Sequence, residues 1–200
     1  MKLKVNDLVK NKYIKRQDRK NQFIFVGRLD KTKGIDKLLS AWQLLSIEGE
    51  EIPKLIVCGT GPEEQWCKQF VLEHNLSSVV KILGFVENNK SIQMIGESIA
   101  LILPTQWYEG FPMTLVEAYG CGTPVLGSKI GNVGSLVIDG ITGYTFNQIS
   151  DNAIVEAVNK LLKVNESELD LYRSTYQYYI AHYTARENYK VLCSIYNKIN

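Results

Sequence analysis

The sequence lacks any long hydrophobic run. No stretch of its 200 residues approaches the roughly 18–20 consecutive apolar residues that span a bilayer. The first 20 residues are basic and contain no apolar segment of the kind found in secretory signals. We therefore expect a cytoplasmic protein, and the hydrophobic residues, which make up 45% of the chain, are sufficient for a globular core.

Metal-binding patterns are also missing. The four cysteines are scattered, no two of them form a C-x-x-C pair, and the two histidines lie far from all of them. This distribution makes a zinc site improbable and fits a reducing cytoplasm. No D-x-D sequence occurs either. We therefore expect neither a metal that bridges a diphosphate nor any other metal cofactor.

Net charge is low and unevenly distributed. The chain carries +2 overall, but residues 1–20 hold eight basic and two acidic side chains. The body of the protein is slightly acidic, which argues against a nucleic-acid partner. We interpret residues 1–20 as a basic linker that is mainly solvated, with contact to an anionic membrane or a partner domain as the alternative. Residues 21–200 then form one folded domain.

Apolar runs alternate with amphipathic segments along most of the chain. Short β-branched and aromatic runs predict buried strands, and the segments between them have apolar residues at helical spacing. This alternation predicts a Rossmann-like, doubly wound parallel sheet flanked by helices. From about residue 151 the pattern instead predicts three extra C-terminal helices in succession. The expected strands cover residues 23–29, 54–59, 79–85, 100–104 and 123–128.

Four loops after these strands, residues 27–34, 59–62, 84–88 and 104–114, are the expected ligand site, because doubly wound sheets bind ligands beyond the carboxyl ends of their strands. The first loop, "VGRLDKTKG", offers the cations Arg28 and Lys33. The second and fourth loops, "CGTGP" and "YEGFPMT", lead into helix starts with free backbone N–H groups. Cations and helix starts together predict an anion site for the phosphate or diphosphate of a nucleoside.

Two carboxylates flank the start of one predicted helix. Pro112 cannot occupy a helix interior, so the helix begins near it. Glu109 then lies in the preceding loop, and Glu117 lies about one turn into the helix. An acid in the position of Glu117 suits a ribose diol, and Glu109 is left for sugar hydroxyls. Diphosphate, ribose and sugar together describe a nucleotide-sugar.

Five segments of the chain, taken in sequence order, resemble the C-terminal, donor-binding half of the group 1 glycosyltransferases, the retaining family 4 with the GT-B fold. The spacing of Glu109 and Glu117 resembles the E-x7-E motif of that family. The resemblance covers residues 20–200. It rests on "FVGRLDKTKGIDKLLSAW", "LIVCGTGP", the pair Gly84–Phe85, "LILPTQWYEGFPMTLVEAYGCGTPVLGS" and "DGITGYTF".

The resemblance implies a role for each of these residues. Arg28 and Lys33 would hold the diphosphate and stabilise its developing charge, with Glu109 beside the transferred sugar; these three are the catalytic candidates. Glu117 would bind ribose. The amides of residues 110–115 would donate to sugar and phosphate oxygens, and the main chain of residues 84–86 would contact the edge of the nucleobase. The full donor-binding set is Gly27, Arg28, Lys33, Gly59, Gly61, Gly84, Phe85, Val86, Glu109, Gly110, Phe111, Pro112, Met113, Thr114, Leu115 and Glu117.

The implied activity is retaining transfer of a sugar from a nucleoside diphosphate sugar, with UDP as the first candidate, to a saccharide or lipid-linked acceptor. The donor is a substrate, and no cofactor is implied. Two departures from the family are visible. Ser135 stands in a loop, residues 130–137, where an acid is common. The chain also holds one Rossmann-like unit, whereas a complete GT-B enzyme has two.

The resemblance therefore implies a missing N-terminal domain that binds the acceptor. We expect the isolated chain to bind donor but to transfer sugar poorly, and the full enzyme to lie at the inner membrane face. The alternative is a non-catalytic nucleotide-sugar-binding subunit that acts with a separate acceptor-binding chain. A nucleotide-sugar epimerase or dehydrogenase is less well supported, because no G-x-G-x-x-G follows the first strand.

Overall fold

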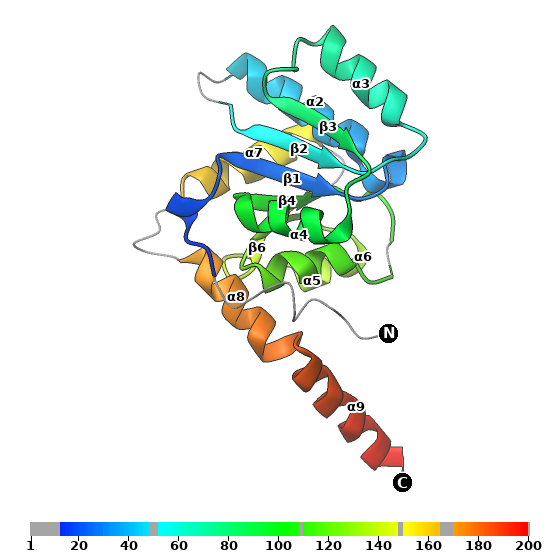
Figure 1. Cartoon of the computed structure of the whole chain (residues 1–200), viewed down its shortest axis with the longest axis vertical. Coiled ribbons are helices and arrows are strands. Elements are labelled where there is room, and N and C mark those ends of the chain that lie inside the picture. Colours follow the sequence, from blue (N-terminus) through cyan, green and yellow to red (C-terminus); the bar gives the residue numbers. More distant parts are fainter. Residues whose placement is uncertain (1–12, 49–51, 109, 148–149, 165–169, 200) are drawn as a thin grey trace.

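A parallel six-stranded sheet forms the centre of the computed structural model, which describes residues 13–48, 52–108, 110–147, 150–164 and 170–199 (Figure 1). The strand order is β3-β2-β1-β4-β5-β6, and every neighbouring pair is parallel. The predicted Rossmann-like class is thereby confirmed. The strands are β1 (Gln22–Val26), β2 (Lys54–Cys58), β3 (Val80–Gly84), β4 (Ala100–Leu103), β5 (Val125–Ser128) and β6 (Gly143–Phe146).

Helices cover both faces of the sheet, α8 packs beside α5, and α9 extends away from the body of the domain (Figure 1). Among the described helices, none is long and apolar enough to cross a membrane. The three C-terminal helices are present as predicted. In chain order the helical elements are η1 (Arg16–Asp18), η2 (Lys31–Lys33), α2 (Ile35–Glu48), α3 (Glu64–Glu73), α4 (Asn88–Glu97), α5 (Met113–Gly120), α6 (Gly131–Leu136), α7 (Asp151–Leu162), α8 (Leu171–His182) and α9 (Ala185–Ile199).

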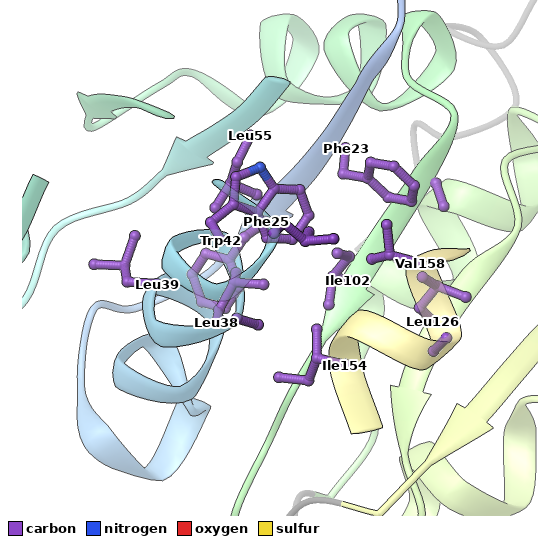
Figure 2. Close-up of a cluster of buried hydrophobic side chains, with 14 of the residues drawn as sticks. Phe23, Phe25, Leu38, Leu39, Trp42, Leu55, Ile102, Leu126, Ile154 and Val158 are labelled. Carbon is purple, nitrogen blue, oxygen red and sulfur yellow. The ribbon is translucent and has the colours of Figure 1, made fainter. Parts of the chain in front are cut away.

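Alternate residues of each strand face two separate apolar layers, as a sheet buried on both sides requires. On one face, Phe23 and Phe25 of β1 lie against α2 and α7 (Figure 2). Trp42 of α2 is fully buried there, with its ring edge-on to Phe23 and its indole N–H donating to the Pro53 carbonyl at 2.9 Å. On the other face, Ile24 packs with residues of α4 and α5.

Two elements differ from the sequence-based expectation. Strand β6 was not predicted, and the segment expected to be the loop 130–137 contains the helix α6. Strand β6 reads "GYTF", which is not the kind of apolar run that located the equally short β4, and α6 has only six residues, too few for a periodic apolar pattern. At the start of β6, Gly143 has a φ of 149°, and a Cβ there would lie 1.8 Å from the Val125 carbonyl oxygen. The close pairing of β5 with β6 therefore depends on glycine.

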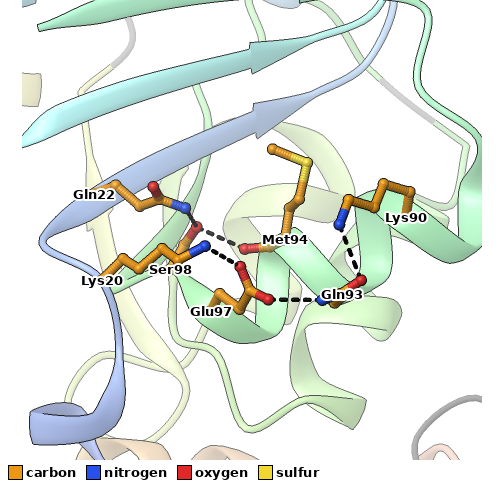
Figure 3. A network of polar contacts seen from close by, with 7 residues as sticks. All are labelled: Lys20, Gln22, Lys90, Gln93, Met94, Glu97 and Ser98. Carbon is orange, nitrogen blue, oxygen red and sulfur yellow. Dashed lines mark hydrogen bonds and ion pairs between the residues drawn. The ribbon is translucent and has the colours of Figure 1, made fainter.

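A polar network fastens the start of β1 to the end of α4 (Figure 3). Lys20 forms an ion pair with Glu97 at 2.6 Å, and this hydrogen bond is the main reason that the pKa of Glu97 is lowered. The Gln22 amide donates to the Ser98 hydroxyl at 3.1 Å, and that hydroxyl donates to the Met94 carbonyl at 2.7 Å. These contacts link the end of α4 to the central strand.

Arg19 is buried although it belongs to the segment that we expected to be solvated. Its side chain is 6% exposed and donates to the Ser98, Cys121 and Gly122 carbonyls and to the Thr123 hydroxyl at 2.7–3.1 Å. Burial lowers the pKa of Arg19 to about 10, so it stays charged at neutral pH. The planar guanidinium thus satisfies several acceptors at the C-terminal end of α5.

We predict that Arg19→Ala lowers the free energy of unfolding by at least about 3 kcal/mol, because several buried acceptors lose their donor at about 1–3 kcal/mol each. Urea unfolding followed by circular dichroism measures this change. Lys15→Ala removes the same charge from an exposed neighbouring position and should have little effect. Equal destabilisation by both variants would contradict the structural role of Arg19.

Candidate functional site

The neighbouring strands β1 and β4 lead to opposite faces of the sheet. The chain after β1 enters α2, which packs on one apolar layer, and the chain after β4 enters α5, which packs on the other. Such a divergence leaves a crevice at the carboxyl ends of the two strands. A cavity of about 380 Å³ lies there, lined by Phe25, Val26, Gly27, Arg28, Lys33, Leu103, Thr105, Phe111, Pro112, Met113 and Thr114.

The two loops that form this cavity are bonded to each other. The Thr32 carbonyl accepts from the Gln106 amide at 2.8 Å and from the Thr105 hydroxyl at 3.1 Å. Gly34 has a φ of 71°, and a Cβ there would lie 1.9 Å from the Pro104 carbonyl oxygen. Because only glycine permits this approach, the first loop is held directly against the fourth. Thr105 was not predicted; nothing in its sequence context distinguishes it.

The glycines of the second and third loops support the first loop and do not line the cavity. The Gly27 amide donates to the Cys58 carbonyl at 3.0 Å, and the Gly59 amide donates to the Gly84 carbonyl at 2.7 Å. A Cβ on Gly59 would lie 1.8 Å from the Gly27 carbonyl oxygen, and one on Gly61 would lie 2.3 Å from the Leu29 carbonyl oxygen. These glycines allow close contact between backbones.

Helix α5 begins where the sequence predicted. Pro112 precedes its first residue, and Met113 and Thr114 form its first turn at the cavity wall. The amides of a first turn have no preceding turn to accept them, so they are available to an anion. In the ligand-free chain the amide of Leu115, the last of the predicted set, donates to the Pro112 carbonyl at 3.1 Å, and the Leu115 side chain is fully buried.

Both predicted cations, Arg28 and Lys33, line the cavity. Arg28 is largely exposed, and its Nε lies 2.7 Å from Asp30 Oδ2. Burial would raise the pKa of Asp30, but hydrogen bonds from Thr32 and from the Lys33 amide, together with the Arg28 charge, lower it. Asp30 also caps η2, which carries Lys33. Asp30, which the sequence analysis did not single out, thus orders the cationic loop.

Glu117 lies outside the cavity lining, in the neighbouring space between α5 and α4. Its side chain is 8% exposed, and its Oε1 accepts a hydrogen bond from Asn88 Nδ2 at 2.9 Å. Burial raises the pKa of Glu117, and the Asn88 hydrogen bond opposes this shift. Within the described parts of the chain, no ion pair involves Glu117. A buried carboxylate without a cation is typical of functional sites.

Asn88 ends the third predicted loop but was not singled out as a site residue. It is the first residue of α4, so the structure places it between the segment 84–86 and Glu117. In that segment Phe85 is 77% exposed, whereas Val86 packs against the apolar layer of α4 and α5. No local signal reveals Asn88, because its partner lies 29 residues further along the chain.

The other residues of the predicted E-x7-E stretch have different positions. Glu109 lies outside the described residues. Gly110 is exposed, and its carbonyl accepts a hydrogen bond from Asn132 of α6. Phe111 lines the cavity, with its ring centroid 6.5 Å from that of Tyr183. Ser135 lies in α6, outside this stretch; it is exposed and donates to the Asn132 carbonyl at 3.2 Å. The stretch therefore reaches both the cavity and α6.

Comparison with known proteins identifies the family. Residues 9–178 match the family described as glycosyl transferases group 1, and the chain belongs to this family. A glycogen synthase of Mycobacterium tuberculosis is 26% identical over 141 residues, which are 70% of this chain and 34% of that protein. The first curated relatives are matched over only 34% to 41% of their own length.

Solved structures share the fold. Anabaena HepE, solved with UDP, superposes with a TM-score of 0.76 at 19% identity, over 98% of this chain and 52% of HepE. The C-terminal domain of a group 1 family protein, LpcC of Francisella tularensis, superposes with a TM-score of 0.71 at 18% identity, over 85% of this chain and 90% of that domain. The chain thus has the fold of a single domain from this family.

We predict that Glu117→Gln raises the stability of the ligand-free protein near neutral pH. Glutamine keeps the acceptor for Asn88, whereas the buried carboxylate has a raised pKa and so destabilises the folded state when ionised. The gain should shrink as the pH falls toward the ordinary glutamate value of 4.5, below which both states are protonated. Thermal melts across this range test the prediction, and a pH-independent or negative effect would contradict it.

Proposed function

We propose that this chain is the donor-binding half of a retaining glycosyltransferase whose donor is a nucleoside diphosphate sugar, with UDP as the first candidate nucleotide. The observation that carries the proposal is the cavity at the carboxyl ends of β1 and β4. Arg28 and Lys33 enter it from one loop, and the first turn of α5 enters it from the other. Membership of the glycosyl transferases group 1 and the UDP bound to HepE are consistent with this ligand class.

The diphosphate occupies the cavity in this proposal. Two cations and first-turn amides suit its charge, because charge-assisted hydrogen bonds and a helix N-terminus both favour anions. In the ligand-free chain the exposed Arg28 guanidinium is paired with Asp30, whose carboxylate is largely buried. Because Asp30 also accepts hydrogen bonds from the Thr32 hydroxyl and the Lys33 amide, it keeps these partners when Arg28 turns to a phosphate oxygen.

The nucleoside extends from the cavity toward α4. Glu117 accepts hydrogen bonds from the ribose diol, and the main chain of residues 84–86 edges the base. The exposed ring of Phe85 lies beside that path. Glu109, which lies outside the described residues, stands beside the transferred sugar in the proposed arrangement. The donor is held by side chains and amides alone, so we propose no metal cofactor.

Catalysis in this proposal consists mainly of stabilising the leaving group. The bond between the anomeric carbon and the diphosphate breaks, its electron pair stays on the diphosphate, and the acceptor hydroxyl adds to the same face of the sugar and loses its proton. Arg28, Lys33 and the start of α5 would stabilise the negative charge. Removing one such preorganised donor typically costs about 3–4 kcal/mol in the transition state.

A second domain supplies the acceptor site in this proposal. The curated relatives are more than twice as long as the matched region, and HepE is about twice as long as its matched part. A full enzyme that acts on lipid-linked acceptors would lie at the inner membrane face. In the alternative, the acceptor site belongs to a separate chain and this chain is a binding subunit. Mixing it with such a chain and assaying transfer distinguishes the two.

Calorimetry with UDP, GDP and ADP tests the donor site on the isolated chain. We expect one of the three to bind, and Glu117→Ala to weaken that binding by roughly tenfold through loss of the ribose contact. A failure of all three to bind at millimolar concentration would overturn the proposed function. Efficient sugar transfer by this chain alone would overturn its assignment as half an enzyme.

The proposed phosphate contacts predict substitutions that weaken binding of the nucleotide but not of the nucleoside. Arg28→Ala and Lys33→Ala should each weaken UDP binding by roughly tenfold and leave uridine binding unchanged, because a charge-assisted hydrogen bond is worth about 1.5–3 kcal/mol. Lys31→Ala is the matched control, since Lys31 lies in η2 beside Lys33, is exposed and does not line the cavity. Equal effects of Lys31→Ala and Lys33→Ala would mean that the overall positive charge of the loop, and not a specific contact of Lys33, attracts the nucleotide.

A further inference from the structure

Glu117 is held in a way that core packing does not require. Helix α5 is covered by apolar side chains, yet it presents a carboxylate to the interior. Within the described residues, this carboxylate is hydrogen-bonded to the Asn88 side chain, whose Nδ2 lies 2.9 Å from Glu117 Oε1. An ionised carboxylate can only accept hydrogen bonds, so the amide nitrogen of Asn88 must be the atom that faces it.

Asn88 is suited to orient this group. It starts α4 directly after the third loop, and it is itself exposed, so its amide lies at the surface of the site. The two helices pack against each other and fix the distance between their side chains. Because the hydrogen bond engages only Oε1, the second carboxylate oxygen keeps its lone pairs for another donor.

We propose that Asn88 is a positioning residue for ribose recognition: it anchors Oε1 of Glu117 and leaves Oε2 to accept from the 2′- and 3′-hydroxyls of a nucleoside diphosphate. This inference rests on the proposed function. A carboxylate anchored on one side meets both hydroxyls of a diol with little loss of side-chain entropy. The site then favours ribose over deoxyribose, since a missing hydroxyl removes one of the two hydrogen bonds to Oε2.

The test is a comparison of UDP with 2′-deoxy-UDP. Calorimetry on the full chain should show that wild type prefers UDP, and that Asn88→Ala reduces this preference by roughly fivefold to tenfold while 2′-deoxy-UDP binding changes little. Asn89→Ala is the matched control, because Asn89 is exposed in the same helical turn and should leave both affinities unchanged. Thermal melts of each variant check that the fold is intact.

A double-mutant cycle separates positioning from an independent contact. If Asn88 acts through Glu117, Asn88→Ala should have no further effect on UDP affinity once Glu117→Ala is present. Additive losses, or an unchanged ratio of UDP to 2′-deoxy-UDP affinity in Asn88→Ala, would overturn the inference while leaving the donor site intact. Absence of binding of UDP, GDP and ADP alike by wild type would instead point to failure of the proposed function; if GDP or ADP binds in place of UDP, the comparison uses that nucleotide and its 2′-deoxy form.

Discussion

The pairing of β1 with β4 is the constraint on which the candidate site depends. Phe23 is in register with Ala100 and Ile24 with Leu101, so the two strands end side by side. Their following segments then separate to opposite faces of the sheet, toward α2 and α5. Backbone hydrogen bonds keep the strand ends together, and beyond them the chain continues to α2 on one face and to α5 on the other, which leaves the cavity between. Its walls combine the ends of β1 and β4 with the loops that follow them and the first turn of α5.

Close contact between backbones is the second requirement. The first loop lies against the second at Gly59 and against the fourth at Gly34, and at both positions a Cβ would come within 2 Å of a carbonyl oxygen. A site that binds phosphate through a short loop gains from this rigidity, because little ordering remains to be done when the ligand arrives. The glycines thus keep the loop that carries Arg28 and Lys33 in place.

The sequence predicts the parts of this arrangement that are local. Apolar runs locate five of the strands, Pro112 locates the start of α5, and the glycine-bounded loop after β1 identifies Arg28 and Lys33. Contacts between distant segments could not be predicted. The burial of Arg19 depends on carbonyls about 100 residues away, and Asn88 meets Glu117 across two helices. The six residues of α6 are too few to show a helical period, and β6 lacks the apolar run that located the other strands.

In the described structure of the ligand-free chain, Arg28 and Glu117 do not pair with each other. Arg28 is paired with Asp30 at the surface, and Glu117 is paired with a neutral amide in the interior. A direct ion pair between Arg28 and Glu117 would satisfy both groups and leave neither for a ligand. Holding the carboxylate buried without a cation instead costs stability, which is the trade expected where a group is retained for binding. This separation of charge matches a ligand that is anionic at one end and carries hydroxyl donors at the other, as a nucleoside diphosphate is.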